Sequence, residues 1–344
     1  MVEKLTLRQS KVLEATVENY ILTAAPVASH SVTAAFSKPW SSATIRNTMA
    51  TLEKIGYLLH PHTSSGKIPT DKGYRTYVDE LMVAREIGEL QQEYIHRRLQ
   101  QISGDIEKHV QLVVHIISEI TGCIGIAIAP SSDSLYLESI GLIPASAGRV
   151  LFVLELGGGQ LESVIAEADD EIQIERLSMI EGILRERLCG LSLNEILVSI
   201  DARLKDSMAD SLAIRSLLFH KTDDMISRYS QGELFVHGMS RIIKTPEFSD
   251  QQNIEVLANL LDDSNRLREL IVTDADDGVS VIIGDEHEST DLFSFTTFCR
   301  SFECTAGKGS LGILGPKRVA YAELTPILEY LTEELSDTIE YGES

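Results

Sequence analysis

Between positions 41 and 47 the chain carries polar side chains of the types that read DNA bases. Arginine forms two hydrogen bonds with guanine, asparagine forms two with adenine, and serine and threonine hydroxyls bond to bases or phosphates. Several residues of these types occur in quick succession here. We therefore predict base or near-base contacts from Ser42, Thr44, Arg46 and Asn47.

A second set of residues, on both sides of the first, could hold the phosphate backbone of a duplex. The run His62–Lys67 combines small residues with one lysine, which suits a loop that lies against DNA. Lysine and arginine neutralise phosphates and so supply much of the affinity for nucleic acid. We predict phosphate or loop contacts from Ser41, His62, Thr63, Lys67, Lys72 and Arg75.

The elements that would position these side chains follow from the apolar spacing. Pro26 and Pro39 separate three amphipathic segments, because proline interrupts a helix. In the third segment Ile45, Met49 and Leu52 recur at helical spacing, which leaves positions 46 and 47 on the outer face. We expect helices over about 5–23, 27–36 and 43–55, and short strands at about 57–60 and 67–69.

Three helices followed by a two-stranded ribbon are typical of a winged helix-turn-helix domain. In that arrangement the third helix enters the major groove, and the ribbon forms a wing beside the duplex. The pattern alone leaves a second interpretation open, in which the three helices form a protein-interaction domain.

Beyond residue 80 the hydrophobic pattern changes twice. Helical spacing over about 74–120, with a break at Ser103-Gly104, gives way to short apolar runs that predict strands. A long stretch of helical spacing over 172–261 then precedes further strand-like runs and a closing helix at about 320–339. This order predicts an α+β domain interrupted by a helical insertion. The expected strands are 124–129, 135–143, 150–156, 161–168, 279–284, 294–304 and 310–314.

The charge distribution separates the N-terminal segment from the rest of the chain. The 344 residues carry 30 Lys and Arg against 52 Asp and Glu, a net charge of −22. Residues 1–80 hold 9 basic and 7 acidic residues, a net of +2, so the remainder carries −24. An acidic body repels nucleic acid, and only the N-terminal segment is suited to face a duplex. We expect a DNA affinity that depends on salt, with few phosphate contacts per protomer.

Several functional classes are excluded by features that the sequence lacks. Charges interrupt the N-terminal residues at short intervals, so a signal peptide is not expected. The apolar run at 123–129 is too short for a membrane span, and the cysteines suggest neither a disulfide framework nor a zinc motif. We find no catalytic constellation such as G-x-S-x-G or H-E-x-x-H. The expected protein is cytoplasmic, binds no membrane, metal or cofactor, and is not an enzyme.

Three weaker patterns have simpler structural interpretations. Gly157–Gly159 could cradle a phosphate, but its spacing favours a hairpin turn. Asp274–Gly278 departs from the spacing of a calcium loop and is better explained as an Asp-Gly turn. His60 and His62 have no further metal ligand at suitable spacing, so we interpret them as loop residues near phosphate.

The N-terminal segment also resembles a known family. Ser41–Leu58, SSATIRNTMATLEKIGYL, is similar to the recognition segment of the HrcA family, the bacterial heat-inducible transcription repressors. His60–Asp79 resembles the wing and exit helix of that family, and Leu7-Arg8-Gln9 resembles part of its first helix. Pro246-Glu247-Phe248 and Ile313–Tyr321 resemble its C-terminal signatures, so the resemblance extends over the whole chain.

Two C-terminal positions depart from the pattern of the family. Lys317 stands where we expect threonine, in a Thr-Arg pair after Gly-Pro. Ala320 stands where an acidic residue often precedes the tyrosine. Neither departure touches the segment that would read DNA.

The resemblance implies a multidomain α+β protein with three kinds of domain. These are an N-terminal winged helix-turn-helix, a GAF-like α+β domain and an inserted helical dimerisation domain. The implied boundaries are 1–80 for the winged-helix DNA-binding domain, 81–103 for a connecting helix, 104–190 and 265–344 for the two parts of the GAF-like domain, and 191–264 for the inserted dimerisation domain.

The resemblance also implies a function and its partners. The family represses chaperonin and chaperone operons by binding an inverted-repeat operator in double-stranded DNA as a homodimer. The GroE chaperonin is the implied partner that maintains repressor activity, and heat diverts it to unfolded proteins. One alternative stays open, a ligand-sensing regulator in which a small molecule in the GAF-like domain sets DNA affinity.

Overall fold

The computed structural model describes residues 4–36, 40–61, 66–102, 106–130, 136–145, 149–157, 160–167, 174–205, 232–249, 251–272, 278–304 and 307–340. The chain forms two compact units. The first unit comprises residues 1–127, 234–302 and 310–344, and the second comprises 128–233 and 303–309. Among the described residues, no helix is long and apolar enough to cross a lipid bilayer.

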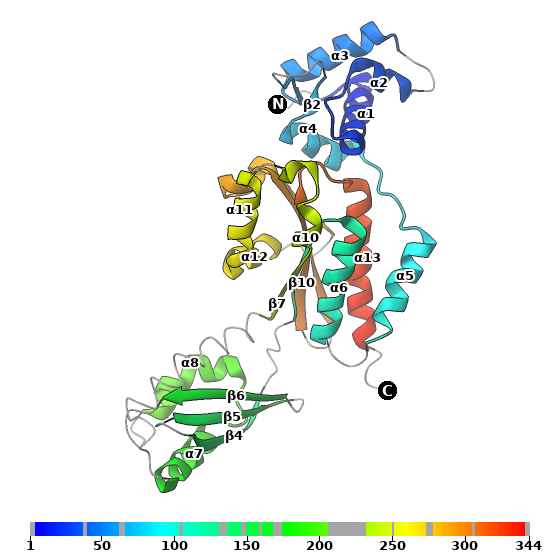
Figure 1. Ribbon diagram of the computed structural model, residues 1–344. Helices are drawn as coiled ribbons and strands as arrows, with labels where there is room; N and C mark the ends of the chain where they lie inside the picture. The colour runs from blue at the N-terminus through cyan, green and yellow to red at the C-terminus, as the bar shows by residue number, and fades with distance from the viewer. Residues whose placement is uncertain are drawn as a thin grey trace. The chain divides into compact units, whose positions relative to one another are not determined.

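The first unit begins with three helices, a two-stranded ribbon and a fourth helix (Figure 1). The elements are α1 (Leu7–Thr23), α2 (Ser29–Ala34), α3 (Ser42–Lys54), β1 (Leu58–Leu59), β2 (Ile68–Pro69) and α4 (Asp71–Thr76). The two strands pair antiparallel, with Leu58 opposite Pro69. The three expected helices and both strands are therefore present, within a few residues of their predicted bounds.

Local sequence explains where these helices begin and how they pack. Thr6 and Gln9 form a reciprocal capping box at the start of α1, which satisfies two backbone N–H groups of the first turn. Leu13 on α1 is fully buried, as are Ile45 and Leu52 on α3. The helical apolar spacing thus becomes the core between α1 and α3, and the opposite face of α3 is left to polar residues.

The connecting helix expected over 81–103 is shorter in the structure. The elements in this stretch are the π-helical turn η1 (Tyr77–Leu81) and α5 (Glu89–Leu99). Residues 82–88 between them are not helical. The amide of Met82 still donates to the carbonyl oxygen of Tyr77 in η1, but the amide of Arg85 donates to the carbonyl oxygen of Ala322 at 2.8 Å, a distant part of the chain.

A five-stranded sheet of order β7-β3-β10-β9-β8 lies at the centre of the first unit. Its strands are β3 (Ile124–Ile128), β7 (Leu234–His237), β8 (Ser280–Ile283), β9 (Phe295–Cys304) and β10 (Gly307–Pro316). Helices α6 (Ile106–Thr121) and α13 (Tyr321–Glu340) pack against each other beside the sheet (Figure 1). Ile124, Phe298 and Ile313 are fully buried on its strands. β7 was not expected, because four residues are too few to show a strand period within a helical region.

Short helical elements complete the first unit. They are α10 (Met239–Ile242), η3 (Pro246–Phe248), α11 (Gln251–Asp262), α12 (Ser264–Ile271), η4 (Gly284–Glu286) and η5 (Thr290–Leu292). Asp263 caps α12 by accepting from the backbone amides of Asn265 at 3.1 Å and Arg266 at 3.2 Å. The turn expected at Asp274–Gly278 lies outside the described residues, except for Gly278.

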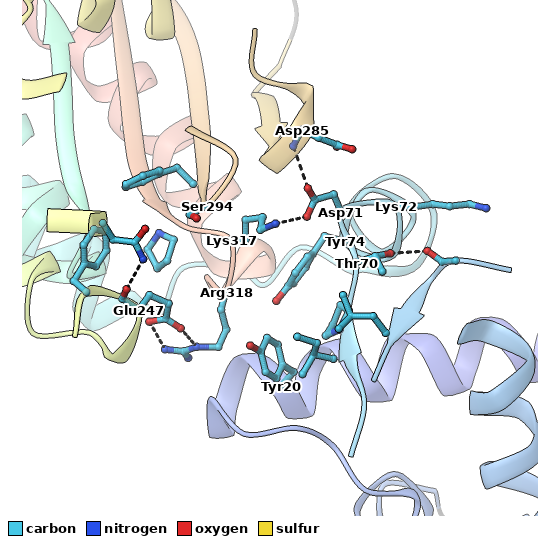
Figure 2. Close-up of a pocket in the computed structure, with 18 residues that line it drawn as sticks. Tyr20, Thr70, Asp71, Lys72, Tyr74, Glu247, Asp285, Ser294, Lys317 and Arg318 are labelled. Carbon is cyan, nitrogen blue, oxygen red and sulfur yellow. Dashed lines mark hydrogen bonds and ion pairs between the residues drawn. The ribbon is translucent and has the colours of Figure 1, made fainter. Parts of the chain in front are cut away.

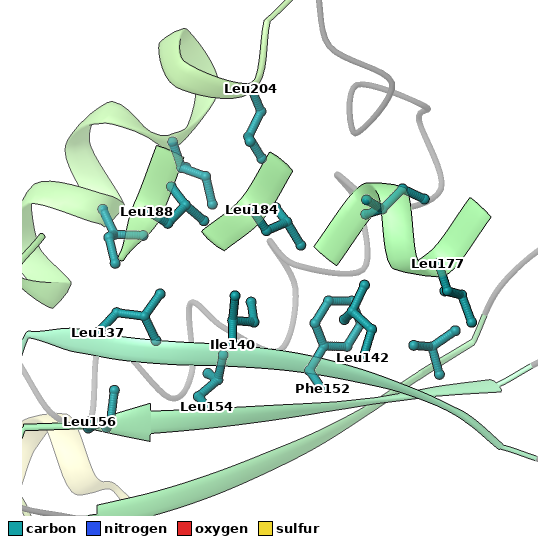
Figure 3. Close-up of a cluster of buried hydrophobic side chains, with 14 residues drawn as sticks. Leu137, Ile140, Leu142, Phe152, Leu154, Leu156, Leu177, Leu184, Leu188 and Leu204 are labelled. Carbon is teal, nitrogen blue, oxygen red and sulfur yellow. The ribbon is translucent and has the colours of Figure 1, made fainter. Parts of the chain in front are cut away.

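The second unit is a three-stranded antiparallel sheet with two helices on one face. Its elements are β4 (Leu137–Ala145), β5 (Arg149–Leu156), β6 (Gln160–Glu167), α7 (Ile174–Leu188) and α8 (Leu193–Leu204). Leu156 pairs with Gln160 at the end of the β5–β6 ladder. The hairpin turn expected at Gly157–Gly159 lies outside the described residues, except for Gly157. Leu142, Phe152 and Leu184 belong to a buried apolar cluster between sheet and helices (Figure 3).

The opposite face of this sheet also carries apolar side chains, which are exposed on β4 and β6 and half-buried on β5. Leu151 on β5 pairs with Ile143 on β4 and with Ile165 on β6, so the three residues form a row across the strands. Ile143 is 51% exposed and Ile165 is 48% exposed. Val153, two positions along β5, lies on the same face. Contiguous apolar surface of this kind marks interaction sites in many proteins.

The boundaries of the compact units differ from those of the expected insertion. The sequence predicts an inserted dimerisation domain at 191–264, whereas the second unit begins at 128 and ends its longer segment at 233. β4, β5 and β6 therefore lie with α7 and α8, and α11 and α12 lie in the first unit. The dimerising role of the insertion stays a prediction.

The surroundings of His115 in the first unit predict a pH dependence of stability. The rings of His115 on α6 and His237 on β7 stack with centroids 3.7 Å apart. Burial, and then the neighbouring His237, lower the pKa of His115 against the opposing effect of Glu119. The unfolded chain therefore takes up a proton more readily, and stability falls as pH drops below about 6.5.

We expect the melting temperature to be lower at pH 5.5 than at pH 7.5, because the unfolded chain binds a proton at His115 more readily than the folded chain does. The measurement is thermal unfolding of the wild type and of His115→Gln. The variant should lose part of the decrease. An identical pH profile in both proteins would show that His115 does not contribute.

Candidate nucleic-acid interface

The start of α3 is fixed by two of the predicted contact residues. Ser41 is the N-cap of α3, and its Oγ accepts a hydrogen bond from the amide of Thr44 at 3.1 Å. The hydroxyls of Ser41 and Thr44 also lie 2.8 Å apart. A capped N-terminus presents the remaining amides of the first turn outward, where they can receive a phosphate oxygen.

Ser42, Arg46 and Asn47 lie on the exposed face of α3. Among the described residues, no hydrogen bond or ion pair holds the guanidinium of Arg46. The structure therefore brings three of the four predicted base-contacting residues together on one surface, with Thr44 half-buried beside them. Thr48, one turn further along α3, is buried and donates its hydroxyl to the carbonyl of Thr44 at 2.9 Å.

A polar hollow of about 270 Å³ lies between α1 and α3. Arg8 and Gln9 line it from α1, and Thr44, Asn47 and Thr51 line it from α3. Arg8 was not among the predicted contact residues, although its segment formed part of the family resemblance. Its place beside Asn47 adds a second arginine to the same surface.

Lys67 lies at the base of the ribbon and is held on both sides. Its ammonium group forms an ion pair with Glu53 on α3. Its backbone amide and carbonyl both bond to Val27, at 2.9 and 2.8 Å. Lys67 thus joins the ribbon to α3 and to the chain before α2, and a role in phosphate binding stays a prediction.

Lys72, on α4, lies against the C-terminal end of α3. Its ammonium group donates to the carbonyl oxygen of Ile55 at 2.9 Å and sits 4.2 Å from the centre of the Tyr57 ring. A cation at this place compensates the unpaired carbonyls of the helix end. The side chain of Thr70 donates to the carbonyl oxygen of Gly56 at 2.7 Å, so the start of α4 is bonded to the end of α3 twice.

Arg75 contacts residues far away in the sequence. Its Nε donates to Glu286 at 2.7 Å, and it also pairs with Asp79 at 3.1 Å and bonds to the carbonyl of Val281. The hydrogen bond with Glu286 is the largest cause that raises the pKa of Arg75. The structure places Arg75 against β8 and η4, and its contact with phosphate stays a prediction.

The predicted wing tip is only partly described. His62 and Thr63 lie outside the described residues. His60 is described, and its Nδ1 lies 2.9 Å from the carbonyl oxygen of Gly66, which closes the base of the ribbon. In the described part of the chain, no group of three or more His, Cys, Asp or Glu side chains could hold a metal ion.

Comparison with known proteins identifies relatives over nearly the whole chain. The family model described as "HrcA protein C terminal domain" matches residues 107–324. The chain is 31% identical to the heat-inducible transcription repressor HrcA of Pelotomaculum thermopropionicum, over 98% of this chain and 97% of that protein. It is 32% identical to the repressor of the same name from Moorella thermoacetica, over 97% of each.

A solved structure has the same fold over the same extent. This crystal structure, described as that of a hypothetical protein, covers 98% of this chain and is itself covered to 99%, with a TM-score of 0.62 at 25% identity. The N-terminal residues that precede the family model are thus also shared with the full-length relatives.

Proposed function

Because the chain belongs to the HrcA family of heat-inducible transcription repressors, we propose that it represses chaperonin and chaperone operons by binding an inverted-repeat operator. The observation that carries this proposal is the exposed polar start of α3, where Ser42, Arg46 and Asn47 share one surface. Side chains of these types match the donor and acceptor pattern of base edges in the major groove.

The N-terminal elements support a winged helix-turn-helix as the DNA-binding domain. α1, α2 and α3 are followed by an antiparallel ribbon whose base is bonded to α3 through Lys67 and Glu53. In such domains the third helix reads the major groove while the ribbon lies against the backbone. We assign phosphate contacts to Ser41, to the ribbon and to Arg8, which lines the hollow beside α3.

An inverted repeat requires two copies of the recognition helix related by a two-fold axis, so the proposed repressor is a homodimer. We assign the dimer surface to the apolar row formed by the exposed Ile143 and Ile165 and the half-buried Leu151 between them in the second unit. A self-complementary apolar sheet face gives each copy the same surface to bury. This assignment uses β4–β6 of the second unit in place of the 191–264 segment that the sequence predicts.

We assign the proposed GAF-like domain to the five-stranded sheet and its helices. In the proposed scheme the activity of the repressor depends on the GroE chaperonin. In this scheme the chaperonin favours the DNA-binding form of the repressor. Heat diverts the chaperonin to unfolded proteins, and the fraction of active repressor falls by mass action. Repression is then lost when unfolded protein accumulates.

A second candidate, control by a small molecule, is favoured by one cavity. A cavity of about 610 Å³, within the usual size range of ligand sites, is lined by Tyr20 and Tyr74 from the N-terminal elements and by Phe248, Phe295 and Arg318 (Figure 2). A ligand here would touch both the DNA-binding elements and the body of the first unit. The ligand that sets DNA affinity would then bind in this cavity, whereas the sequence predicts a ligand site inside the GAF-like domain.

The test is binding of the purified protein to a labelled duplex that carries the inverted repeat upstream of the chaperonin genes, with a scrambled duplex as the control. We expect preference for the inverted repeat, weaker binding at higher salt, and tighter binding when chaperonin is added. Specific binding that ignores chaperonin would favour control by a small molecule. Equal binding to both duplexes, with and without chaperonin, would refute the proposed function.

A further inference from the structure

α4 is a short helix that is bonded on two sides. Toward α3, Lys72 and Thr70 bond to the carbonyls of Ile55 and Gly56 at the C-terminal end of that helix. Toward the body, Asp71 and its neighbours on α4 contact segments more than 200 residues away in the sequence. A displacement of α4 by the rest of the first unit, here called the body, would therefore also displace the C-terminal end of α3, the proposed recognition helix.

The first contact with the body is made by Asp71. One carboxylate oxygen pairs with the ammonium of Lys317 at 2.5 Å, and the other accepts from the amide of Asp285 at 3.0 Å (Figure 2). The carboxylate of Asp71 approaches Gly284 so closely that a Cβ added to Gly284 would lie 2.1 Å from Asp71 Oδ2. Gly284 also has a φ of +54°, so glycine is suited to this position for two reasons.

The second contact is made by Arg75, one turn further along α4. Its guanidinium binds both carboxylate oxygens of Glu286 and the carbonyl oxygen of Val281. Two-point pairing of this kind fixes orientation as well as distance. Burial raises the pKa of Glu286, but its hydrogen bonds with Arg75 and with the amide of Ile283 outweigh burial and hold that pKa below its usual value. Glu286 is therefore ionised near neutral pH.

Aromatic packing and a third ion pair surround these contacts. Tyr74 and Tyr77 both pack against the ring of the fully buried Tyr321, with centroids 5.6 and 6.5 Å away. Arg318 pairs with Glu247 and donates to the carbonyl of Ile21 in the last turn of α1 at 2.7 Å. The DNA-binding elements are thus held to the body at α1 and at α4.

We propose that Asp71, Arg75, Lys317 and Glu286, here called the α4 latch, determine specificity for the spacing between operator half-sites. The latch fixes α3 relative to the body of its own protomer. In a dimer, a closed latch then removes one source of freedom in the separation and angle of the two recognition helices. A duplex whose half-sites are spaced differently is bound more readily when the latch opens, and the cost of opening it becomes discrimination against that duplex.

The proposal rests on the proposed function, because spacing has meaning only for a dimer on an inverted repeat. It goes beyond that function by separating two kinds of specificity. The exposed face of α3 recognises the bases of each half-site. The latch, which touches no DNA, recognises how far apart the half-sites are.

The test compares affinities for the inverted-repeat duplex and for duplexes whose spacer is longer by about 2, 5 and 10 base pairs, the last restoring the helical phase. The variants are Glu286→Gln and Asp71→Asn, with Glu93→Gln as the matched control. Glu93 pairs with Arg97 on the surface of α5 and contributes nothing to the latch. We expect the wild type and the control to discriminate strongly against the longer spacers, and both latch variants to lose roughly tenfold or more of that discrimination.

A second readout needs no DNA. Residues 83–86 are already exposed, but the amide of Arg85 is bonded to Ala322. Opening of the latch should loosen this attachment, so trypsin should cut after Arg85 faster in Glu286→Gln than in the wild type and the Glu93→Gln control. Unchanged discrimination in both latch variants would overturn the proposal, as would lost discrimination with unchanged cleavage. A wild type that binds the inverted repeat but tolerates every spacer would also overturn it. A wild type that does not prefer the inverted repeat to the scrambled duplex would instead refute the proposed function, and the latch proposal with it.

Discussion

Replacing Arg46 with alanine should weaken binding to the inverted repeat by about 1–3 kcal/mol, which is roughly a 5- to 150-fold loss in affinity. Arg46 is exposed on α3, and in the described part of the chain nothing engages its guanidinium. A free guanidinium near the start of a recognition helix is suited to bind guanine through two hydrogen bonds. The measurement is a binding titration against duplexes that vary one base pair at a time, in which the variant should lose discrimination at one position of each half-site.

The matched control is Lys54→Ala, which removes one positive charge from the last turn of the same helix. Lys54→Ala should weaken binding to every duplex by about the same factor, because a lysine near the phosphate backbone of DNA carries no base information. That factor should be smaller than the loss caused by Arg46→Ala. An equal loss on every duplex for Arg46→Ala would show that Arg46 contacts phosphate instead. No loss on any duplex would remove Arg46 from the interface.

The local part of the candidate site could be predicted from sequence. The apolar spacing of Ile45, Met49 and Leu52 defines the buried side of α3, and Ser41 is a strong N-cap. These features depend on residues within one or two turns of each other. For that reason the helix bounds and the exposed positions of Arg46 and Asn47 agree with the structure.

The partners of the basic residues could not be predicted in the same way. Arg75 binds Glu286, and Asp71 binds Lys317, across more than 200 residues of sequence. Lys317 is also the position where the family resemblance predicts threonine. Nothing in local spacing indicates that a lysine there pairs with the first residue of α4. The sequence therefore predicts a phosphate contact for Arg75 and no role for Asp71, Lys317 or Glu286, because it does not reveal their tertiary neighbours.

Sheet pairing was the second limit of sequence reasoning. The strands expected at 124–129 and 135–143 are close in sequence, yet β3 joins the five-stranded sheet and β4 joins a separate one. Strand periodicity shows that a segment is extended, and it contains no information about which strand lies beside it. The assignment of β4–β6 to the second unit, and with it the exposed apolar row, therefore required the structure.

Placing a charge in that row should separate the proposed dimer. Ile143→Asp puts a carboxylate on an exposed position opposite Leu151, so folding of the unit is expected to survive. A carboxylate buried between two copies of the same apolar face would be unpaired, which is strongly unfavourable. We expect sedimentation velocity to show a monomer. Operator affinity should fall by roughly a hundredfold or more, because a monomer binds only one half-site at a time.

Val198→Asp is the control for this prediction. Val198 is 90% exposed on α8, whose buried residues Ile196 and Ile200 cover the opposite face of the sheet. The same chemical change there should leave both the dimer and its operator affinity intact. A dimer that persists in Ile143→Asp would place the dimer surface elsewhere in the chain. Separation of the dimer by both variants would point to a general loss of structure in the second unit, and only separation by Ile143→Asp alone assigns the interface to the β4–β6 face.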